Sequence, residues 1–305
     1  MKFGKLPDVS NVDFSLPCDM PGTQDALQKH RRRGAQVNFY MGSTGWTMKE
    51  WVGTLYPADA KQKDYLKYYS RQFNTIEMNT THYRIPTAEM VERWKNESES
   101  DFKFCPKIPQ TISHSNNLGV NTGLIEQFAE AIEGLGEKLG CCFMQLPPYF
   151  GVDRIPALEA FLEQFPAHIP LAVEVRHGSW FASEKNAVQL FNALEKYNKS
   201  TVITDVAGRR DVLHMRLTNS TAVIRFVGND LHPTDYTRLN DWMWRIDKWY
   251  EQGLENVFFF LHEPEGTAVP DVAAYLLKIL KPFPRYNIRG PKIANENKGQ
   301  QIPLF

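Results

Sequence analysis

The stretch CCFMQLPPYFGVDRIPALEAFLEQFPAHIPLAVEVR, residues 141–176, carries the pattern that decides the fold. It opens with an apolar run over 141–146 and closes with a second over 171–176, and residues 156–165 between them have a helical pattern. Short runs that are apolar almost throughout are typical of parallel strands buried on both faces. The stretch therefore predicts a strand–helix–strand unit.

The same alternation extends over most of the chain. Strand candidates lie at 37–43, 73–79, 102–108, 141–146, 171–176, 201–205, 222–227 and 257–262. Helix-like stretches lie at 59–72, 87–99, 122–139, 156–165, 184–197, 237–252 and 267–280. Eight strands with helices between them predict an α/β protein with a single (β/α)8 TIM-type barrel rather than an open sheet. The connection from 205 to 222 is short, so its helix is expected to be irregular or missing.

Three segments are predicted along the chain, and they differ in charge. Residues 1–36 form an N-terminal extension packed on or near the barrel, 37–280 form the barrel, and 281–305 form an extended basic tail. The 35 basic and 35 acidic residues cancel overall, but residues 1–33 carry +2, residues 34–280 carry −6 and residues 281–305 carry +4. An acidic body argues against strong unaided binding to nucleic acid.

Composition also bears on the compartment. No stretch approaches the roughly 20 apolar residues of a membrane helix, and the N-terminus lacks the apolar segment of a signal peptide. We therefore expect a cytoplasmic protein without a membrane partner. The four cysteines, Cys18, Cys105, Cys141 and Cys142, show no CxxC spacing, so buried, reduced thiols are expected.

Polar side chains gather at the ends of the predicted strands, where a barrel of this type carries its chemistry. Because side chains alternate along a strand, Glu77 and Asn79 share one face, and Glu174 and Arg176 share another. We expect both faces to point into the barrel. Further ionisable or amide groups near strand ends and in the following loops are His82, Tyr83, Lys107, His114, Gln145, His177, Asp205, Arg225, His262 and Glu263. The alternative interpretation is a satisfied structural ion network in the barrel interior.

The first predicted loop is also informative. Gly42, Ser43 and Trp46 are followed by Trp51 and Tyr56. Glycine lets the backbone approach a ligand, and the aromatic rings offer stacking surfaces for a base or a sugar. The alternative is that the tryptophans are part of the core at the barrel mouth.

Several of these segments carry a family pattern. GSTGWTMKEWVGTLYP (42–57), FNTIEMNTTHYRIPT (73–87), FKFCPKIP (102–109), FMQLPPYF (143–150) and AVEVRHGSWF (172–181) resemble the YecE-like family, known as domain of unknown function 72. The resemblance covers roughly residues 37–275 and implies a TIM-type barrel, but no reaction. Motif residues carried over are Gly42, Trp46, Glu77, Asn79, Tyr83, Lys107, Gln145, Pro147, Glu174, Arg176, His177, Trp180, Asp205 and Arg225. The loop after the last strand, with His262 and Glu263, departs from the family pattern.

The chain ends in Gln301, Ile302, Pro303, Leu304 and Phe305. This peptide resembles the bacterial sliding-clamp-binding motif, in which the Leu-Phe pair is an apolar anchor and the glutamine forms hydrogen bonds. The resemblance implies the DNA sliding clamp as a partner, bound through Gln301, Ile302, Leu304 and Phe305. The alternative is that this segment packs on its own barrel.

These observations lead to a set of functional hypotheses. The first is an enzyme of hydrolase or repair type that acts on a phosphate-bearing or nucleic-acid substrate, with the site at the carboxyl-terminal face of the barrel. The second is a metal-free glycoside or metabolite hydrolase with Glu77 and Glu174 as an acid/base pair. The third is a non-catalytic binding module recruited through its C-terminal peptide.

The hypotheses assign a role to each candidate site residue. The expected catalytic residues are Glu77, Lys107, Glu174, Arg176 and Asp205. The expected substrate-binding residues are Ser43, Trp46, Asn79, Tyr83, Gln145, His177, Trp180 and Arg225, with Trp51 as a further sugar platform. In the metal-dependent version of the first hypothesis, a divalent cation binds to Glu77, Glu174, Asp205 and His262.

Overall fold

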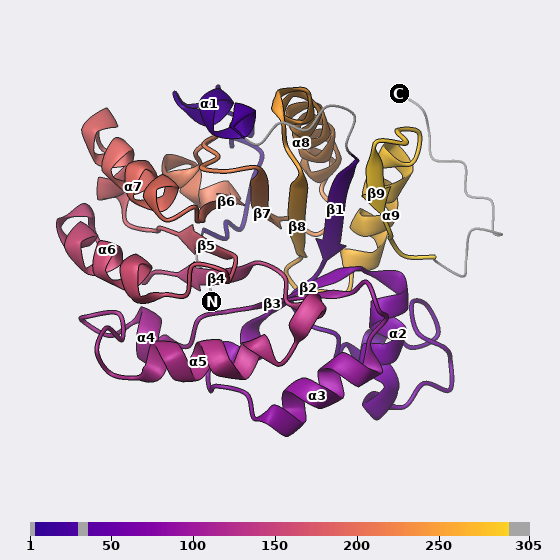
Figure 1. Cartoon of the computed structure of the whole chain (residues 1–305). Coiled ribbons are helices and arrows are strands. Elements are labelled where there is room, and N and C mark those ends of the chain that lie inside the picture. The colour runs from indigo at the N-terminus through magenta and orange to yellow at the C-terminus, as the bar shows by residue number, and fades with distance from the viewer. Residues whose placement is uncertain (1–3, 30–35, 293–305) are drawn as a thin grey trace.

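The computed structural model describes residues 4–29 and 36–292, and the predicted clamp peptide 301–305 lies outside these residues. Helices lie outside the strands on every side of the view in Figure 1. The strands are β1 (Val37–Gly42), β2 (Thr75–Met78), β3 (Lys103–Pro106), β4 (Cys142–Gln145), β5 (Leu171–Glu174), β6 (Ser200–Asp205), β7 (Thr221–Val227), β8 (Asn256–His262) and β9 (Tyr286–Ile288). The first eight confirm the eight predicted strands to within a few residues.

The helices follow the predicted alternation. They are α1 (Thr23–Gln28), α2 (Tyr65–Gln72), α3 (Ala88–Glu97), α4 (Gln110–Ser113), α5 (Leu124–Glu133), α6 (Ile155–Gln164), α7 (Glu184–Lys196), α8 (Pro233–Gln252) and α9 (Val269–Leu280). The short helices α1 and α4 were not predicted, because neither is long enough to show a helical period. The connection from β6 to β7 holds only a 3-10 helix, Ala207–Val212, in agreement with the expected missing helix.

The strands form an α/β fold with a parallel central sheet. Seven strands pair in the order β4-β5-β6-β7-β8-β1-β9, and β2 and β3 form a separate two-stranded sheet. All the pairings are parallel. The ladders among the described residues therefore do not run around a closed barrel.

Backbone hydrogen bonds outside the strand ladders connect the two sheets on both sides. Glu77 N donates to Ser43 O at 2.9 Å beside β1, and Ile108 N donates to Phe143 O at 2.9 Å beside β4. The backbones of β1 and β2 lie so close that a Cβ atom on Gly42 would lie 2.0 Å from Thr75 O. This contact explains why a glycine is needed at position 42.

The two ends of the described chain pack on the body. In the N-terminal segment, Val9 and Phe14 are buried against Ala207, and Arg245 of α8 donates to Asp19 at 2.7 Å. At the other end, β9 pairs with β1, so the first part of the predicted tail belongs to the sheet. Among the residues described, no helix combines the length and the apolar character that a bilayer crossing requires.

Candidate functional site

A cavity of about 430 Å³ lies at the carboxyl-terminal ends of the strands. This is the end at which parallel α/β sheets and barrels generally bind ligands. Its wall is formed by Thr44, Asn79, His82, Tyr83, Lys107, Gln110, His114, Gln145, Arg176, Thr204, Arg225, Val227 and His262. These residues come from the ends of the strands β2 to β8 and from the loops that follow β1 to β8, so the cavity brings together most of the polar strand ends that the sequence singled out.

The floor of the cavity is a buried ion-pair network centred on Arg225. Its guanidinium donates to Glu77 through Nε at 2.8 Å and Nη2 at 3.0 Å, and to Glu174 through Nη1 at 2.8 Å. Both carboxylates are almost completely buried. A planar guanidinium suits this arrangement because its donors match two carboxylates at once.

Side chains two residues apart on one strand face the same way, and both predicted same-face pairs are in contact. Asn79 Nδ2 donates to Glu77 Oε1 at 3.0 Å, and Arg176 Nε donates to Glu174 Oε1 at 3.1 Å. Glu77 Oε2 also contacts His262 Nε2 at 2.9 Å. Each oxygen of Glu77 therefore has two hydrogen-bond partners, which leaves this carboxylate little capacity to react with a substrate.

Both carboxyl groups are held in the ionised form. Burial alone would raise the pKa of Glu77, but Arg225 and His262 hold this pKa well below its usual value. Burial is likewise outweighed at Glu174, where Arg176 and Arg225 lower the pKa to about 2. Neither group carries a proton near neutral pH, so neither fits the general acid of a glycosidase. These carboxylates therefore form the satisfied network of the alternative interpretation.

Lys107 has different surroundings. Its side chain is only 5% exposed, and its Nζ donates to Gln145 Oε1 at 2.9 Å. No described carboxylate lies within ion-pair distance of this ammonium group. Desolvation lowers the pKa of Lys107 to about 8, and Arg225 and Arg176 act in the same direction.

Three histidines complete the wall. Because Glu77 is ionised and can only accept, His262 donates its Nε2 proton to it. His82 Nδ1 lies 3.1 Å from Ile108 O, and its ring packs against His114 with the centroids 5.4 Å apart. Burial is the main cause that lowers the pKa of both His82 and His114. These two rings are therefore mainly neutral at pH 7.

Thr204 of β6 presents a polar atom that has no hydrogen-bond partner among the described residues. Its Oγ1 is buried and makes no hydrogen bond, and its side chain lines the cavity. Buried hydroxyls are rarely left without a partner. This atom is therefore suited to bind a ligand or an ordered water molecule.

Asp205 is a correction to the predicted site. It follows Thr204 on β6, so its side chain points away from the cavity, toward α8. Its Oδ2 accepts from Trp242 Nε1 at 2.8 Å and lies 3.0 Å from Arg238 Nη2, and Arg210 contacts Oδ1. Asp205 therefore anchors α8 and the 3-10 helix after β6, and takes no part in the cavity.

The predicted metal set does not come together. Glu77 and His262 are in contact, but Glu174 is bound by Arg176 and Arg225, and Asp205 lies on the opposite face of its strand. Among residues 4–29 and 36–292, no three His, Cys, Asp or Glu side chains form a group that could hold a metal ion. The residues present therefore do not fit the predicted divalent cation.

Two of the predicted substrate-binding residues are part of the core. Trp180 is fully buried, donates from Nε1 to Phe150 O at 2.9 Å and stacks on the Phe150 ring. Trp46 is half-buried and packs against the main hydrophobic core, which contains Trp51. The aromatic residues of the first loop therefore match the alternative interpretation, in which they are part of the core.

Of the other predicted residues, Tyr83 lines the cavity with a largely exposed ring. Ser43 is turned toward its own loop, where its Oγ donates to Gly45 O at 3.0 Å, and the next residue, Thr44, lines the cavity instead. His177 is exposed and caps the following turn, with Nδ1 2.7 Å from Ser179 Oγ. Ser43 and His177 therefore lie outside the cavity wall.

Sequence reasoning missed several residues of the wall. Thr44, Gln110 and Thr204 were not predicted as site residues, and His82 and His114 were noted but given no role. Alternation along β6 could have identified Thr204, because it lies next to Asp205 and one of the two must face inward. Nothing in the sequence marks Gln110, which comes from the unpredicted helix α4.

Comparison with known proteins places the chain in a family. A family model described as "Protein of unknown function DUF72" matches residues 40–292. The chain belongs to the DUF72 family. It is 30% identical over 260 residues to UPF0759 protein YecE of Escherichia coli K12. The aligned region covers 79% of this chain and 92% of YecE. It is also 26% identical over 151 residues to UPF0759 protein YunF of Bacillus subtilis 168, and this aligned region covers 47% of this chain and 52% of YunF.

A solved structure has the same fold. The crystal structure of a DUF72 family protein from Enterococcus faecalis V583 superimposes with a TM-score of 0.66 at 20% sequence identity. The superposition covers 83% of this chain and 98% of that chain. Membership in the DUF72 family and this fold are therefore shown, but they indicate no reaction and no substrate.

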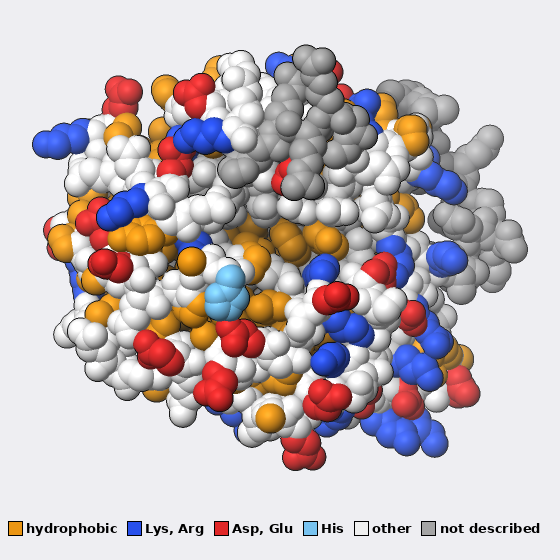
Figure 2. All heavy atoms as spheres, in the orientation of Figure 1, with side chains coloured by type: hydrophobic (Ala, Val, Ile, Leu, Met, Phe, Trp, Pro, Cys, Tyr) orange, Lys and Arg blue, Asp and Glu red, His pale blue; other side chains and the backbone are white. Residues whose placement is uncertain are grey.

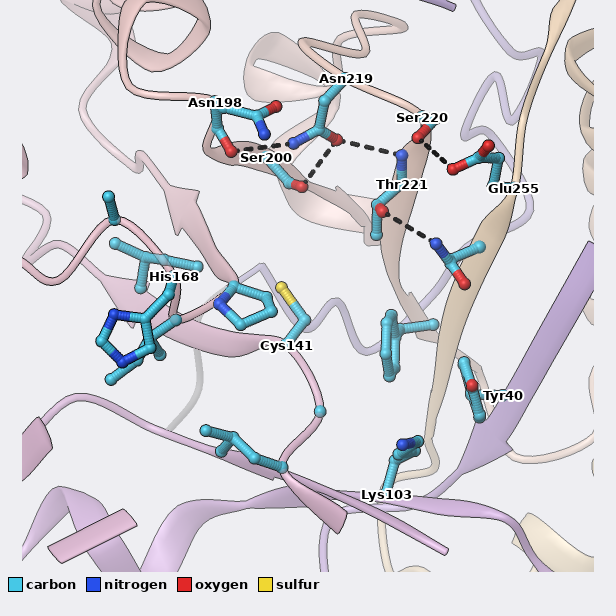
Figure 3. A pocket seen from close by; sticks show the side chains of 18 residues that line it. Tyr40, Lys103, Cys141, His168, Asn198, Ser200, Asn219, Ser220, Thr221 and Glu255 are labelled. Atoms are coloured by element: carbon cyan, nitrogen blue, oxygen red, sulfur yellow. Dashed lines mark hydrogen bonds between the residues drawn. The ribbon is translucent and has the colours of Figure 1, made fainter. Parts of the chain in front are cut away.

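A second cavity, of about 420 Å³, lies at the opposite, amino-terminal ends of the strands. Figure 2 shows hydrophobic side chains in a hollow at the centre of the face drawn there. In Figure 3, Asn219 bonds to Ser200, to Asn198 and to the backbone of Thr221. The amide of Asn219 is thus satisfied within the wall, whereas the first cavity has a buried hydroxyl and a buried lysine still able to bind a ligand.

Proposed function

We propose that the cavity at the carboxyl-terminal strand ends is the active site of an enzyme that acts on a small phosphate-bearing molecule. The observation that carries this proposal is the charge of the site. Among the described residues, the ion pairs of this site join Arg176 and Arg225 to two carboxylates, Glu77 and Glu174, and Lys107 is a third cation beside them. Near neutral pH these described groups carry one positive charge in excess, on a lysine that has no carboxylate partner among them, and an anionic ligand would balance it.

The site also holds a candidate for proton transfer. Because His262 donates its Nε2 proton to Glu77, the neutral tautomer that fits this hydrogen bond has its lone pair on Nδ1. A histidine oriented by a carboxylate is the usual arrangement of a general base. We assign this role to His262, with Glu77 as the positioning residue.

Hydrolysis of a phosphate ester is the reaction that these groups support best. In this reaction a water oxygen attacks the phosphorus atom and His262 accepts a proton from the water. The ester P–O bond breaks, the leaving alkoxide takes a proton from solvent to become the alcohol, and His262 returns its proton to solvent. Lys107 and Arg176 would stabilise the negative charge on the phosphoryl oxygens. Thr204 Oγ1 would bind the water or a phosphoryl oxygen, because none of the described residues forms a hydrogen bond with it.

We also propose that the eight strands β1 to β8 form an irregular TIM-type barrel. The hydrogen bonds from Glu77 N to Ser43 O and from Ile108 N to Phe143 O support this view, because they connect the two sheets on both sides. The cavity would then lie at the face on which barrel enzymes carry their active sites.

Phosphate binding by the purified full chain tests the proposal, measured by isothermal titration calorimetry. Lys107→Met should weaken phosphate binding about 10-fold or more, because a buried charge-assisted hydrogen bond is lost. The matched control is Lys103→Met, which removes the same charge from the second cavity. Lys103→Met should bind phosphate as the unchanged protein does. Absence of phosphate binding by the unchanged protein, or equal loss in both variants, would contradict the proposal.

A panel of phosphate esters then separates an enzyme from a non-catalytic binding module. Release of inorganic phosphate that is lost in His262→Gln, while phosphate binding is kept, would support an enzyme. Binding without turnover across the panel would favour the module. The glycoside hydrolase is not supported, because both carboxylates are paired and ionised.

The peptide 301–305 supports a separate proposal, that the bacterial sliding clamp is a partner. The support is its sequence, Gln301, Ile302, Pro303, Leu304 and Phe305. A pull-down with purified clamp should capture the full chain and fail with Leu304→Ala, Phe305→Ala. Equal capture of both chains would contradict this proposal.

A further inference from the structure

Lys107 is buried in a way that leaves its amine available. Its Nζ lies 5.7 Å from the centroid of the Phe143 ring and forms a single hydrogen bond, to Gln145 Oε1. The side chain lines the cavity at the carboxyl-terminal strand ends. The other N–H groups of the ammonium therefore form no hydrogen bond with any described residue.

The orientation of Gln145 fixes which way the amine points. Gln145 Nε2 donates to Glu174 Oε2 at 2.7 Å, and the ionised carboxylate can only accept. The amide oxygen of Gln145 must therefore face Lys107, which donates to it. This one hydrogen bond restrains the nitrogen while leaving it open toward the cavity.

Two other lysines provide an internal comparison. Lys199 is also buried, but its Nζ donates to three backbone carbonyls, of Pro166, Ala167 and Ile169. Lys138 likewise has three acceptors, within residues 95–98. Burial lowers the pKa of both, so a lowered pKa by itself does not distinguish Lys107. The difference lies in the number of acceptors.

The charge state of Lys107 is compatible with reaction as a nucleophile. With a pKa of about 8, roughly 10% of the amine is neutral at pH 7, against about 0.03% for an ordinary lysine. Burial and neighbouring cations are the means by which enzymes activate a lysine amine toward carbonyl carbon.

We propose that Lys107 Nζ forms an imine with the aldehyde or ketone carbon of a small phosphate-bearing carbonyl compound. The inference rests on the proposed function, because the phosphate would occupy the same cationic cavity, beside Arg176 and Arg225. It names the substrate class and gives Lys107 a covalent role.

The step balances without a further reactant. The nitrogen lone pair attacks the carbonyl carbon, the oxygen receives a proton, and the nitrogen loses one to give a carbinolamine. Water then leaves as the C=N bond forms. The sum is amine plus carbonyl gives imine plus water, with no change in oxidation state.

Borohydride trapping of the full chain tests this inference. The probe is D-glyceraldehyde 3-phosphate, and sodium borohydride reduces any imine to a stable secondary amine. Peptide mass spectrometry should find the adduct on Lys107, formed at least about 10 times faster than with D-glyceraldehyde, which lacks the phosphate. Inorganic phosphate should slow the labelling of Lys107. Lys199 and Lys138 in the same sample are the controls and should stay unlabelled.

The outcomes separate the inference from the proposed function. If phosphate binds in a Lys107-dependent way but Lys107 is not trapped faster than exposed lysines, the imine is overturned and the anion site stands. If neither phosphate nor the probe interacts with the cavity, both are overturned. Mapping on the unchanged chain keeps the test valid even if Lys107→Met fails to fold.

Discussion

Arg225 of β7 forms a two-point ion pair with Glu77 of β2, with Nε–Oε2 at 2.8 Å and Nη2–Oε1 at 3.0 Å. These residues belong to the two different sheets of the protein. The pair therefore joins the sheets across the interior, and it also holds the carboxylate that orients His262.

Removing the charge of Glu77 should destabilise the protein. Glu77→Gln leaves Arg225 buried with one carboxylate fewer, and breaking a buried pair costs about 3–5 kcal/mol. Urea unfolding followed by circular dichroism measures the loss. The control is Glu99→Gln, which breaks an exposed pair with Arg71 and should cost less than about 1 kcal/mol. An equal loss of unfolding free energy in the two variants would show that the buried pair stabilises the fold no more than the exposed pair does.

Acid should destabilise the fold through Glu174. Its pKa is about 2 in the folded protein against 4.5 for the free group. The stability from this carboxylate is therefore fully present above pH 4.5 and is lost as the pH falls toward 2. Urea unfolding at pH 7 and at pH 3.5 should show a smaller pH dependence in Glu174→Gln than in the unchanged chain. An equal pH dependence in both would argue against an ionised Glu174.

Anion binding should weaken as the pH rises through about 8, the pKa of Lys107. The ammonium group is charged below this pH and neutral above it. Sulfate is the suitable probe, because its own charge does not change between pH 6.5 and 9. Lys107→Arg should bind sulfate to pH 9 without this loss, because arginine stays protonated. Imine trapping should change in the opposite direction and increase with pH. Sulfate binding that stays constant from pH 6.5 to 9 would count against Lys107 as the anion-binding cation.

Two neighbouring residues on β6 should have opposite effects. Thr204→Val removes an unpartnered hydroxyl that lines the cavity, so it should weaken ligand binding and leave the unfolding free energy within about 1 kcal/mol. Asp205→Asn disrupts the contacts with Arg238 and Trp242, so it should cost about 2–4 kcal/mol and leave phosphate binding unchanged in the folded fraction. The two measurements are urea unfolding and calorimetry with phosphate. The reverse result would show that Asp205, and not Thr204, faces the cavity.

Much of the fold and part of the site could be predicted from the sequence. The eight strands appear as short apolar runs, and alternation placed Glu77 with Asn79 and Glu174 with Arg176 on common faces. These features are local, because a strand has a side-chain period of two. The same period left Asp205 ambiguous, since either Thr204 or Asp205 could face inward.

The sequence by itself determined the order of strands and helices and which side chains share a face of one strand. Only the tertiary structure decided which faces meet. It brought Arg225 between Glu77 and Glu174, turned Asp205 toward α8, and left Lys107 with one amide oxygen as its partner. The physical reason is that the charge state and the availability of a buried group depend on neighbours from distant segments, and a local pattern contains no information about them.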